Sequence, residues 1–146
     1  MTKPIYILNG PNLNRLGVRE PNIYGTTTLA EVETMSREVA GTHPVVFKQS
    51  NAESQIIDWI HEAIDEGSGI IINPAGLTFT SIPILDALKM FPGPIIELHI
   101  SNIHKREAIY HNSLVSRVAT AVIAGLGVDG YPTAVSAILR MMNARL

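Results

Sequence analysis

The sequence predicts a single α/β domain built on a doubly wound, five-stranded parallel sheet. Five short apolar runs end at turn residues, and amphipathic stretches separate them. Hydrophobic residues make up 46% of the 146-residue chain and charged residues only 16%, a balance that fits strands buried on both faces. The length is typical of one domain, and no linker or internal repeat divides residues 1–146.

The expected strands are short and mostly β-branched, and they cover residues 5–8, 45–47, 69–72, 94–98 and 121–124. Apolar residues at helical spacing predict helices at 29–40, 56–64, a segment capped by Ser81 or Thr80, and 131–145. Strands that alternate with helices form parallel sheets, and such sheets bind ligands beyond the carboxyl ends of their strands. Polar residues follow several of these strands, namely Asn9, Asn12, Ser50, Asn51, Asn73, His99 and Ser101. The sequence therefore predicts one polar cleft at that edge.

Charge and composition argue against several classes of protein. A net charge of −2 does not favour nucleic-acid binding, and the absence of cysteine excludes disulfides and thiol nucleophiles. The apolar run near the N-terminus is too short for a signal peptide or a membrane span, so we expect a cytoplasmic protein that does not bind membranes. The histidines lack zinc-like spacing, so no metal is expected. Residues 125–130 match a dinucleotide-binding glycine pattern, but they follow the last expected strand, and a tight turn without cofactor is the preferred interpretation.

The segment 14–25 has no apolar periodicity, and glycines and a proline interrupt it. We expect a lid loop here that closes over a substrate. It carries Arg19 and Tyr24. A phenol titrates at about pH 10 and is a poor base near neutrality, but a nearby guanidinium stabilises the phenolate. The pair could thus form a general base on closure, although the spacing alone favours a tyrosine that only packs its ring.

Glu97 and His99 lie two residues apart on an expected strand, so their side chains point to the same side of the sheet. A carboxylate in this position can orient an imidazole and stabilise its charged form, as a general acid requires. A purely structural pair is the alternative. Ser101 and the amides around Ile100 follow on the next loop, where they could bind a carboxylate or form a plain turn.

Taken together, these segments resemble the type II 3-dehydroquinate dehydratases over nearly the whole chain. The matching blocks are residues 7–14 (Ile-Leu-Asn-Gly-Pro-Asn-Leu-Asn), 19–25, 49–51 (Gln-Ser-Asn), 73–78 (Asn-Pro-Ala-Gly-Leu-Thr), 97–102 (Glu-Leu-His-Ile-Ser-Asn) and 125–131. Several ordered blocks at matching intervals are more specific than any single motif.

The resemblance implies a flavodoxin-like fold, trimers grouped into a homo-dodecamer, and a small-molecule substrate. The implied reaction is the trans elimination of water from 3-dehydroquinate through an enolate, without metal or cofactor. The resemblance implies that Tyr24 is the base, that Arg19 favours its phenolate, and that Asn12 holds a water at the enolate oxygen. It implies that His99 is the acid and that Glu97 orients it. The implied ligands of the substrate carboxylate are Asn73, Ile100 and Ser101, and Asp86 is implied to reach a neighbouring subunit's site.

Two positions depart from the family pattern. Phe79 stands where the family usually has histidine, and Tyr110 stands where it usually has arginine; in the family both contact the distal ring hydroxyls. Phe79 cannot form a hydrogen bond, and Tyr110 offers one hydroxyl in place of a guanidinium. Two alternatives therefore stay open beside the dehydroquinate dehydratase: a paralogous dehydratase of a related cyclic hydroxy-keto acid, and a catalytically silent binding protein. The intact set of proton-transfer residues argues against the silent protein.

Overall fold

A five-stranded parallel sheet in the order β2-β1-β3-β4-β5 forms the centre of the protein. We describe residues 2–144 from a computed structural model. The strands are β1 (Ile5–Asn9), β2 (Val45–Gln49), β3 (Gly69–Asn73), β4 (Ile95–His99) and β5 (Ala121–Ala124). The predicted doubly wound α/β fold is confirmed. The strands β1 to β4 end one or two residues later than predicted, β4 also starts one residue later, and β5 has the predicted bounds. Four of them end on polar residues, namely Asn9, Gln49, Asn73 and His99.

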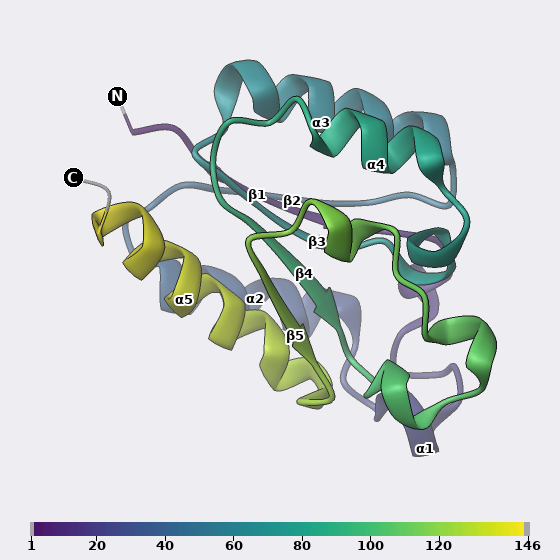
Figure 1. Cartoon of the computed structure of the whole chain (residues 1–146). Coiled ribbons are helices and arrows are strands. Elements are labelled where there is room, and N and C mark those ends of the chain that lie inside the picture. The colour runs from purple at the N-terminus through teal and green to yellow at the C-terminus, as the bar shows by residue number, and fades with distance from the viewer. Residues whose placement is uncertain (1, 145–146) are drawn as a thin grey trace.

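Helices cover both faces of the sheet (Figure 1). On one face lie α2 (Leu29–Ala40) and α5 (Gly130–Ala144), and on the other lie α3 (Glu53–Glu66) and α4 (Ile82–Leu88). The helix predicted at 131–145 is observed as α5, which starts one residue earlier than predicted; residue 145 lies outside the described residues. None of the helices in the described part of the chain has the length and apolar run needed to span a membrane.

Alternate residues of β1 contribute to the two core layers. Ile5 and Ile7 belong to the layer under α2 and α5, whereas Tyr6 and Leu8 belong to the layer under α3 and α4. Every residue of β1, β3 and β4 is buried. A central sheet covered on both sides therefore accounts for the apolar composition. Helical spacing from Val32 predicts an inner position for Val39 on α2, but the structure shows that Val39 is exposed.

Local sequence signals fix the starts of two helices. The side chain of Thr28 accepts a hydrogen bond from the Glu31 amide while the Glu31 carboxylate accepts one from the Thr28 amide, which is a capping box at the start of α2. Ser81, one of the two predicted caps, accepts from the Ile84 amide at the start of α4.

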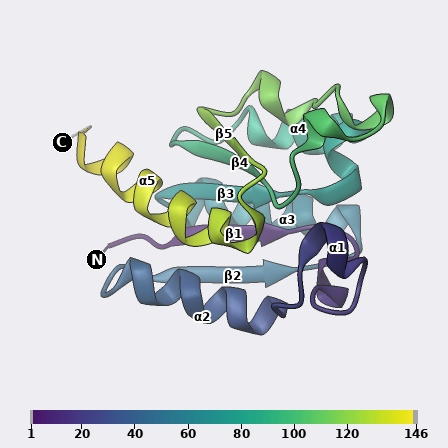
Figure 2. The same ribbon diagram turned by 90° about the horizontal axis from the view of Figure 1, so that it is seen from below.

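The expected lid segment 14–25 contains short helical turns in place of a fully irregular loop. A 3-10 turn spans Leu13–Arg15, and the four-residue helix α1 spans Pro21–Tyr24, with proline in its first turn. Leu16 between them is buried in the core and anchors the segment. Figure 2 shows the arrows of β1 and β2 pointing towards α1, so this segment lies at the carboxyl end of the sheet.

Candidate active site

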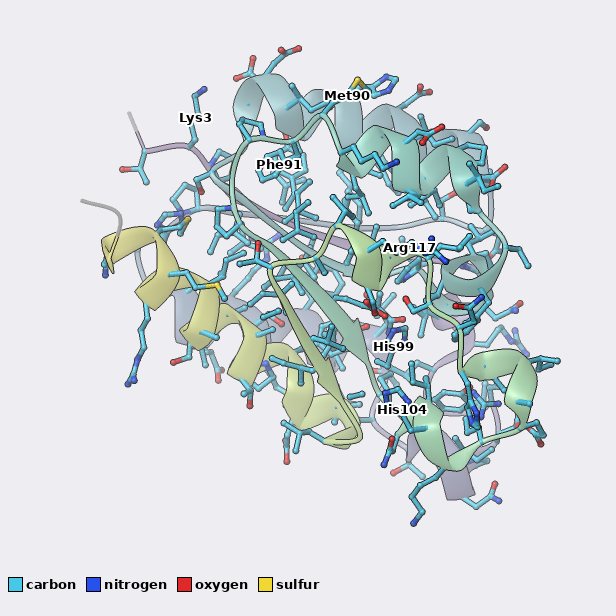
Figure 3. All side chains as sticks on the ribbon, viewed as in Figure 1. Lys3, Met90, Phe91, His99, His104 and Arg117 are labelled. Carbon is cyan, nitrogen blue, oxygen red and sulfur yellow. The ribbon has the colours of Figure 1, made fainter. Side chains whose placement is uncertain are left out.

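A cavity of about 230 Å³ opens at the carboxyl end of the sheet, where the sequence predicts the cleft. Its size suits a small organic molecule. Most residues singled out from the sequence line it, namely Asn12, Arg19, Tyr24, Asn73, Phe79, His99, Ile100, Ser101 and Tyr110. Glu97 lies outside the lining and contacts His99, while Asp86 lies apart on α4. Figure 3 labels His99 at the carboxyl end of β4 and His104 on the segment that follows this strand.

His99 and Glu97 form a buried pair on β4. The His99 Nε2 donates to Glu97 Oε2 at 2.5 Å, and both side chains are almost completely shielded from solvent. Ser113 and Ser116 also donate to the Glu97 carboxylate, at 2.8 and 2.5 Å. Burial by itself would raise the pKa of Glu97, but the hydrogen bonds and the charge of His99 together hold this pKa below its ordinary value. The carboxylate is therefore ionised and fixes the orientation of the imidazole, whose Nδ1 is left free of Glu97.

Two guanidinium groups surround Tyr24. Arg106 Nη1 donates to the Tyr24 hydroxyl at 3.1 Å. Arg19 lies over the face of the ring, 4.7 Å from its centre, and pairs with Glu20. The sequence-based expectation joined Tyr24 to Arg19 alone; the structure places Arg106 on the oxygen atom, where a hydrogen bond to a phenolate is strongest.

Asn12 lies in a tight turn after β1, with a positive φ of 73°. Its amide N–H donates to Asn51 Oδ1 at 2.9 Å, and Gln49 Nε2 donates to the same oxygen at 3.2 Å. The polar residues after β2 thus hold the Asn12 turn in the left-handed region, which asparagine tolerates better than most residues.

The loop after β4 carries Ile100 and Ser101 along the cavity. The amide of Gly125 donates to the carbonyl of His99 at 3.3 Å, and that of Gly127 donates to the carbonyl of Ile100 at 3.0 Å. Both glycines have positive φ, 91° and 63°. The glycine pattern at 125–130 therefore braces this loop, in line with the preferred interpretation as a tight turn.

Aromatic rings form one wall of the cavity. Phe79 stacks on His99 with ring centres 6.2 Å apart and meets Tyr110 edge to face at 5.5 Å. The Arg106 guanidinium lies 4.0 Å from the centre of the Tyr110 ring. The two residues that depart from the family pattern are therefore neighbours, and they make this wall largely apolar.

Asp86 lies on α4, outside the lining of this cavity, with its side chain 65% exposed and its carboxylate 3.8 Å from Lys89 Nζ. A role in its own subunit's cavity does not fit this position, whereas a role towards a neighbouring subunit stays a prediction. Among residues 2–144, no group of three or more His, Asp or Glu side chains is arranged to hold a metal ion.

Several residues of the site were missed by the sequence reasoning. Arg106 follows β4 by seven positions, and a basic residue on the loop of a predicted cleft was the available signal. Ser113 and Ser116 carry no periodic or motif signal that would assign them to Glu97. Tyr131 belongs to a matching block but was not given a role, although its hydroxyl contacts Asn9 and Asn73 beneath the cavity.

The model of the family described as dehydroquinase class II matches residues 3–139. The chain belongs to this family. A curated 3-dehydroquinate dehydratase of Cereibacter sphaeroides is 58% identical, with 92% of this chain and 93% of that protein aligned. The 3-dehydroquinate dehydratase 2 of Agrobacterium fabrum is 54% identical, over 94% and 95% of the two chains.

Solved structures of class II dehydroquinases share the fold as well. The type II dehydroquinase of Propionibacterium acnes superposes with a TM-score of 0.88 at 44% identity, covering 96% of this chain and 98% of that one. The family assignment made from the sequence blocks is thus confirmed, and so is the flavodoxin-like fold that it implied.

Proposed function

We propose that this protein is a hydro-lyase that removes water from 3-dehydroquinate and forms 3-dehydroshikimate, as in the shikimate pathway or in quinate catabolism. One observation carries the proposal. Tyr24, with Arg106 on its hydroxyl, and His99, with Glu97 on its imidazole, line the same cavity. Elimination next to a ketone needs a base for the carbon-bound proton and an acid for the departing hydroxyl, and these two residues supply one of each.

The base half of the reaction uses the loop 14–25. The Tyr24 phenolate takes the proton next to the ketone, and Arg106 and Arg19 stabilise its negative charge through a hydrogen bond and a contact with the ring. The electron pair moves into an enolate. Asn12, which lines the cavity, is proposed to hold a water molecule that stabilises the enolate oxygen.

The acid half uses β4. His99 is held by Glu97 through Nε2, so Nδ1 is the atom that delivers a proton to the leaving hydroxyl. The carbon–oxygen bond breaks as the enolate collapses, and water and the conjugated enone are the products. Asn73 and the backbone of Ile100 and Ser101 are proposed to bind the substrate carboxylate, close to the reacting carbon.

The test is a spectrophotometric assay of the purified protein with 3-dehydroquinate that follows the conjugated enone. We expect turnover in the wild-type protein and a loss of roughly 10²- to 10⁴-fold in Tyr24→Phe, the usual contribution of a positioned general base. Tyr6→Phe is a matched control, because it also removes a bonded phenol hydroxyl, but the partner of that hydroxyl is Glu62, away from the cavity. An inactive wild-type protein with native circular dichroism would favour the catalytically silent alternative.

A second candidate substrate is favoured by the aromatic wall. Phe79 and Tyr110 face the cavity with rings in edge-to-face contact, which suits a substrate with fewer distal hydroxyls than 3-dehydroquinate. Each substrate hydroxyl left without a partner costs roughly 1–3 kcal/mol. If the true substrate is such a relative, a deoxy analogue of 3-dehydroquinate will have the higher kcat/KM, and Phe79→His with Tyr110→Arg will reverse the preference. A higher kcat/KM for 3-dehydroquinate in the wild type would exclude this candidate.

The proposal includes a cytoplasmic location and an assembly of trimers into a dodecamer. Exposed apolar side chains such as Ile82 and Met90 on or beside α4, and the outward position of Asp86 on the same helix, support an interface there. Light scattering after size exclusion gives the number of subunits. An active monomer would refute the assembly and the proposed role of Asp86 across it.

A further inference from the structure

A buried tyrosine links the first and third strands beneath the cavity. Tyr131, in the first turn of α5, is 0% exposed. Its hydroxyl donates to Asn9 Oδ1 at 2.7 Å and accepts from Asn73 Nδ2 at 3.1 Å. Burial raises the pKa of Tyr131, so the group stays a neutral phenol with one hydrogen to donate.

Asn9, Tyr131 and Asn73 form a chain of hydrogen bonds. The donor and acceptor of each bond are fixed at the end of this hydrogen-bond chain that lies on β1. Asn9 Nδ2 donates to the backbone carbonyl of Lys48 at 3.0 Å, and a carbonyl can only accept. The side-chain oxygen of Asn9 therefore faces Tyr131 and takes the only hydrogen of the hydroxyl. The Tyr131 oxygen is left to act as an acceptor towards Asn73.

The β3 end gives the same direction independently. Asn73 Oδ1 accepts from the amide N–H of Ala75 at 3.2 Å, and a backbone N–H can only donate. The NH₂ group of Asn73 therefore faces Tyr131. One of the two N–H bonds of this NH₂ group donates to the Tyr131 hydroxyl. Because Asn73 lines the cavity, the other N–H is available to a ligand there.

We infer that Tyr131 is a positioning residue for the substrate site: together with the Ala75 amide, its phenol oxygen holds the Asn73 amide so that Asn73 presents an N–H donor, and not a carbonyl oxygen, to the anionic group of the substrate. The inference rests on the proposed function and deepens it. Neither Asn9 nor Tyr131 lines the cavity, so each acts only through Asn73. Removing the phenol oxygen leaves the Asn73 amide without its fixed acceptor and weakens its bond to the substrate anion.

The experiment compares Tyr131→Phe with Tyr6→Phe in the assembled enzyme. Tyr6 is a matched control because it is also a buried tyrosine with a bonded hydroxyl, but its partner is Glu62, away from the cavity. We expect KM for 3-dehydroquinate to rise about tenfold in Tyr131→Phe with kcat changed less than about threefold, since the lost interaction serves ground and transition states alike. Tyr6→Phe should leave both constants unchanged.

Two further variants keep the inference falsifiable if Tyr131→Phe folds poorly. Asn9→Ala removes the acceptor of the phenol hydrogen and should reproduce the rise in KM. In an Asn73→Ala background, Tyr131→Phe should add no further rise. A fall in kcat at unchanged KM, or an equal further rise in that background, would overturn the inference alone. No turnover by the wild-type protein would overturn the proposed function and, with it, the anion assigned to Asn73.

Discussion

Replacing Glu97 by glutamine tests the acid half of the site most directly. The carboxylate accepts hydrogen bonds from His99, Ser113 and Ser116. Glutamine keeps one oxygen, while its NH₂ group cannot accept from the donors that remain. A hydrogen bond to a charged group is worth about 1.5–3 kcal/mol, and roughly 1.4 kcal/mol corresponds to a tenfold change in rate. We therefore expect kcat to fall about 10- to 150-fold.

The assay follows enone formation over a range of pH. KM should change much less than kcat, because Glu97 does not line the cavity. The loss should persist into acidic pH, because the lowered pKa of Glu97 keeps its carboxylate ionised there in the wild-type protein. Glu62→Gln is the matched control: Glu62 also accepts a hydrogen bond, from the Tyr6 hydroxyl at 2.6 Å, but it lies away from the cavity.

Two results would refute this reasoning. One is a folded Glu97→Gln protein whose kcat stays within about twofold of wild type, which would make the buried pair structural. The other is an equal loss of kcat in Glu62→Gln, which would assign the effect to general destabilisation.

The buried Glu97 also makes the free energy of unfolding depend on pH. The pKa of Glu97 is lower in the folded state than its ordinary value of 4.5. The ionised Glu97 therefore stabilises the folded protein fully above pH 4.5, and this contribution is lost as the pH falls through the lower folded-state pKa. The urea midpoints of the wild-type protein and of Glu97→Gln should converge in acid. Arg106→Lys keeps the charge but loses the planar fork, so kcat should fall about tenfold in the enone assay if Arg106 stabilises the Tyr24 phenolate. A Cβ on Gly10 would lie 2.4 Å from a backbone oxygen, so Gly10→Ala should lower the free energy of unfolding in urea by about 1–3 kcal/mol. Gly76→Ala, where a Cβ meets nothing within 4 Å, should change it little.

The fold was predictable because its signals are local. Alternating short β-branched runs and helical stripes define the elements, and Ser81 begins α4 where a capping residue was expected. The edge of the sheet that holds the cavity follows from parallel topology, which places Asn73 and His99 at neighbouring strand ends. The Glu97–His99 pair follows from the two-residue repeat of a strand. The irregular appearance of segment 14–25 was less informative, because the short turn that carries Tyr24 has too few residues to show periodicity.

By itself the sequence determined the fold class, the family and most of the side chains that line the cavity. Only the tertiary structure decided which partner each of them has. Arg106 lies 82 positions from Tyr24 yet donates a hydrogen bond to its hydroxyl oxygen. Tyr131 lies 122 positions from Asn9 yet donates a hydrogen bond to its side-chain oxygen. Such contacts depend on how helices and loops pack over the carboxyl end of the sheet. A periodic pattern records which face of an element is buried, but it does not record which distant element covers that face.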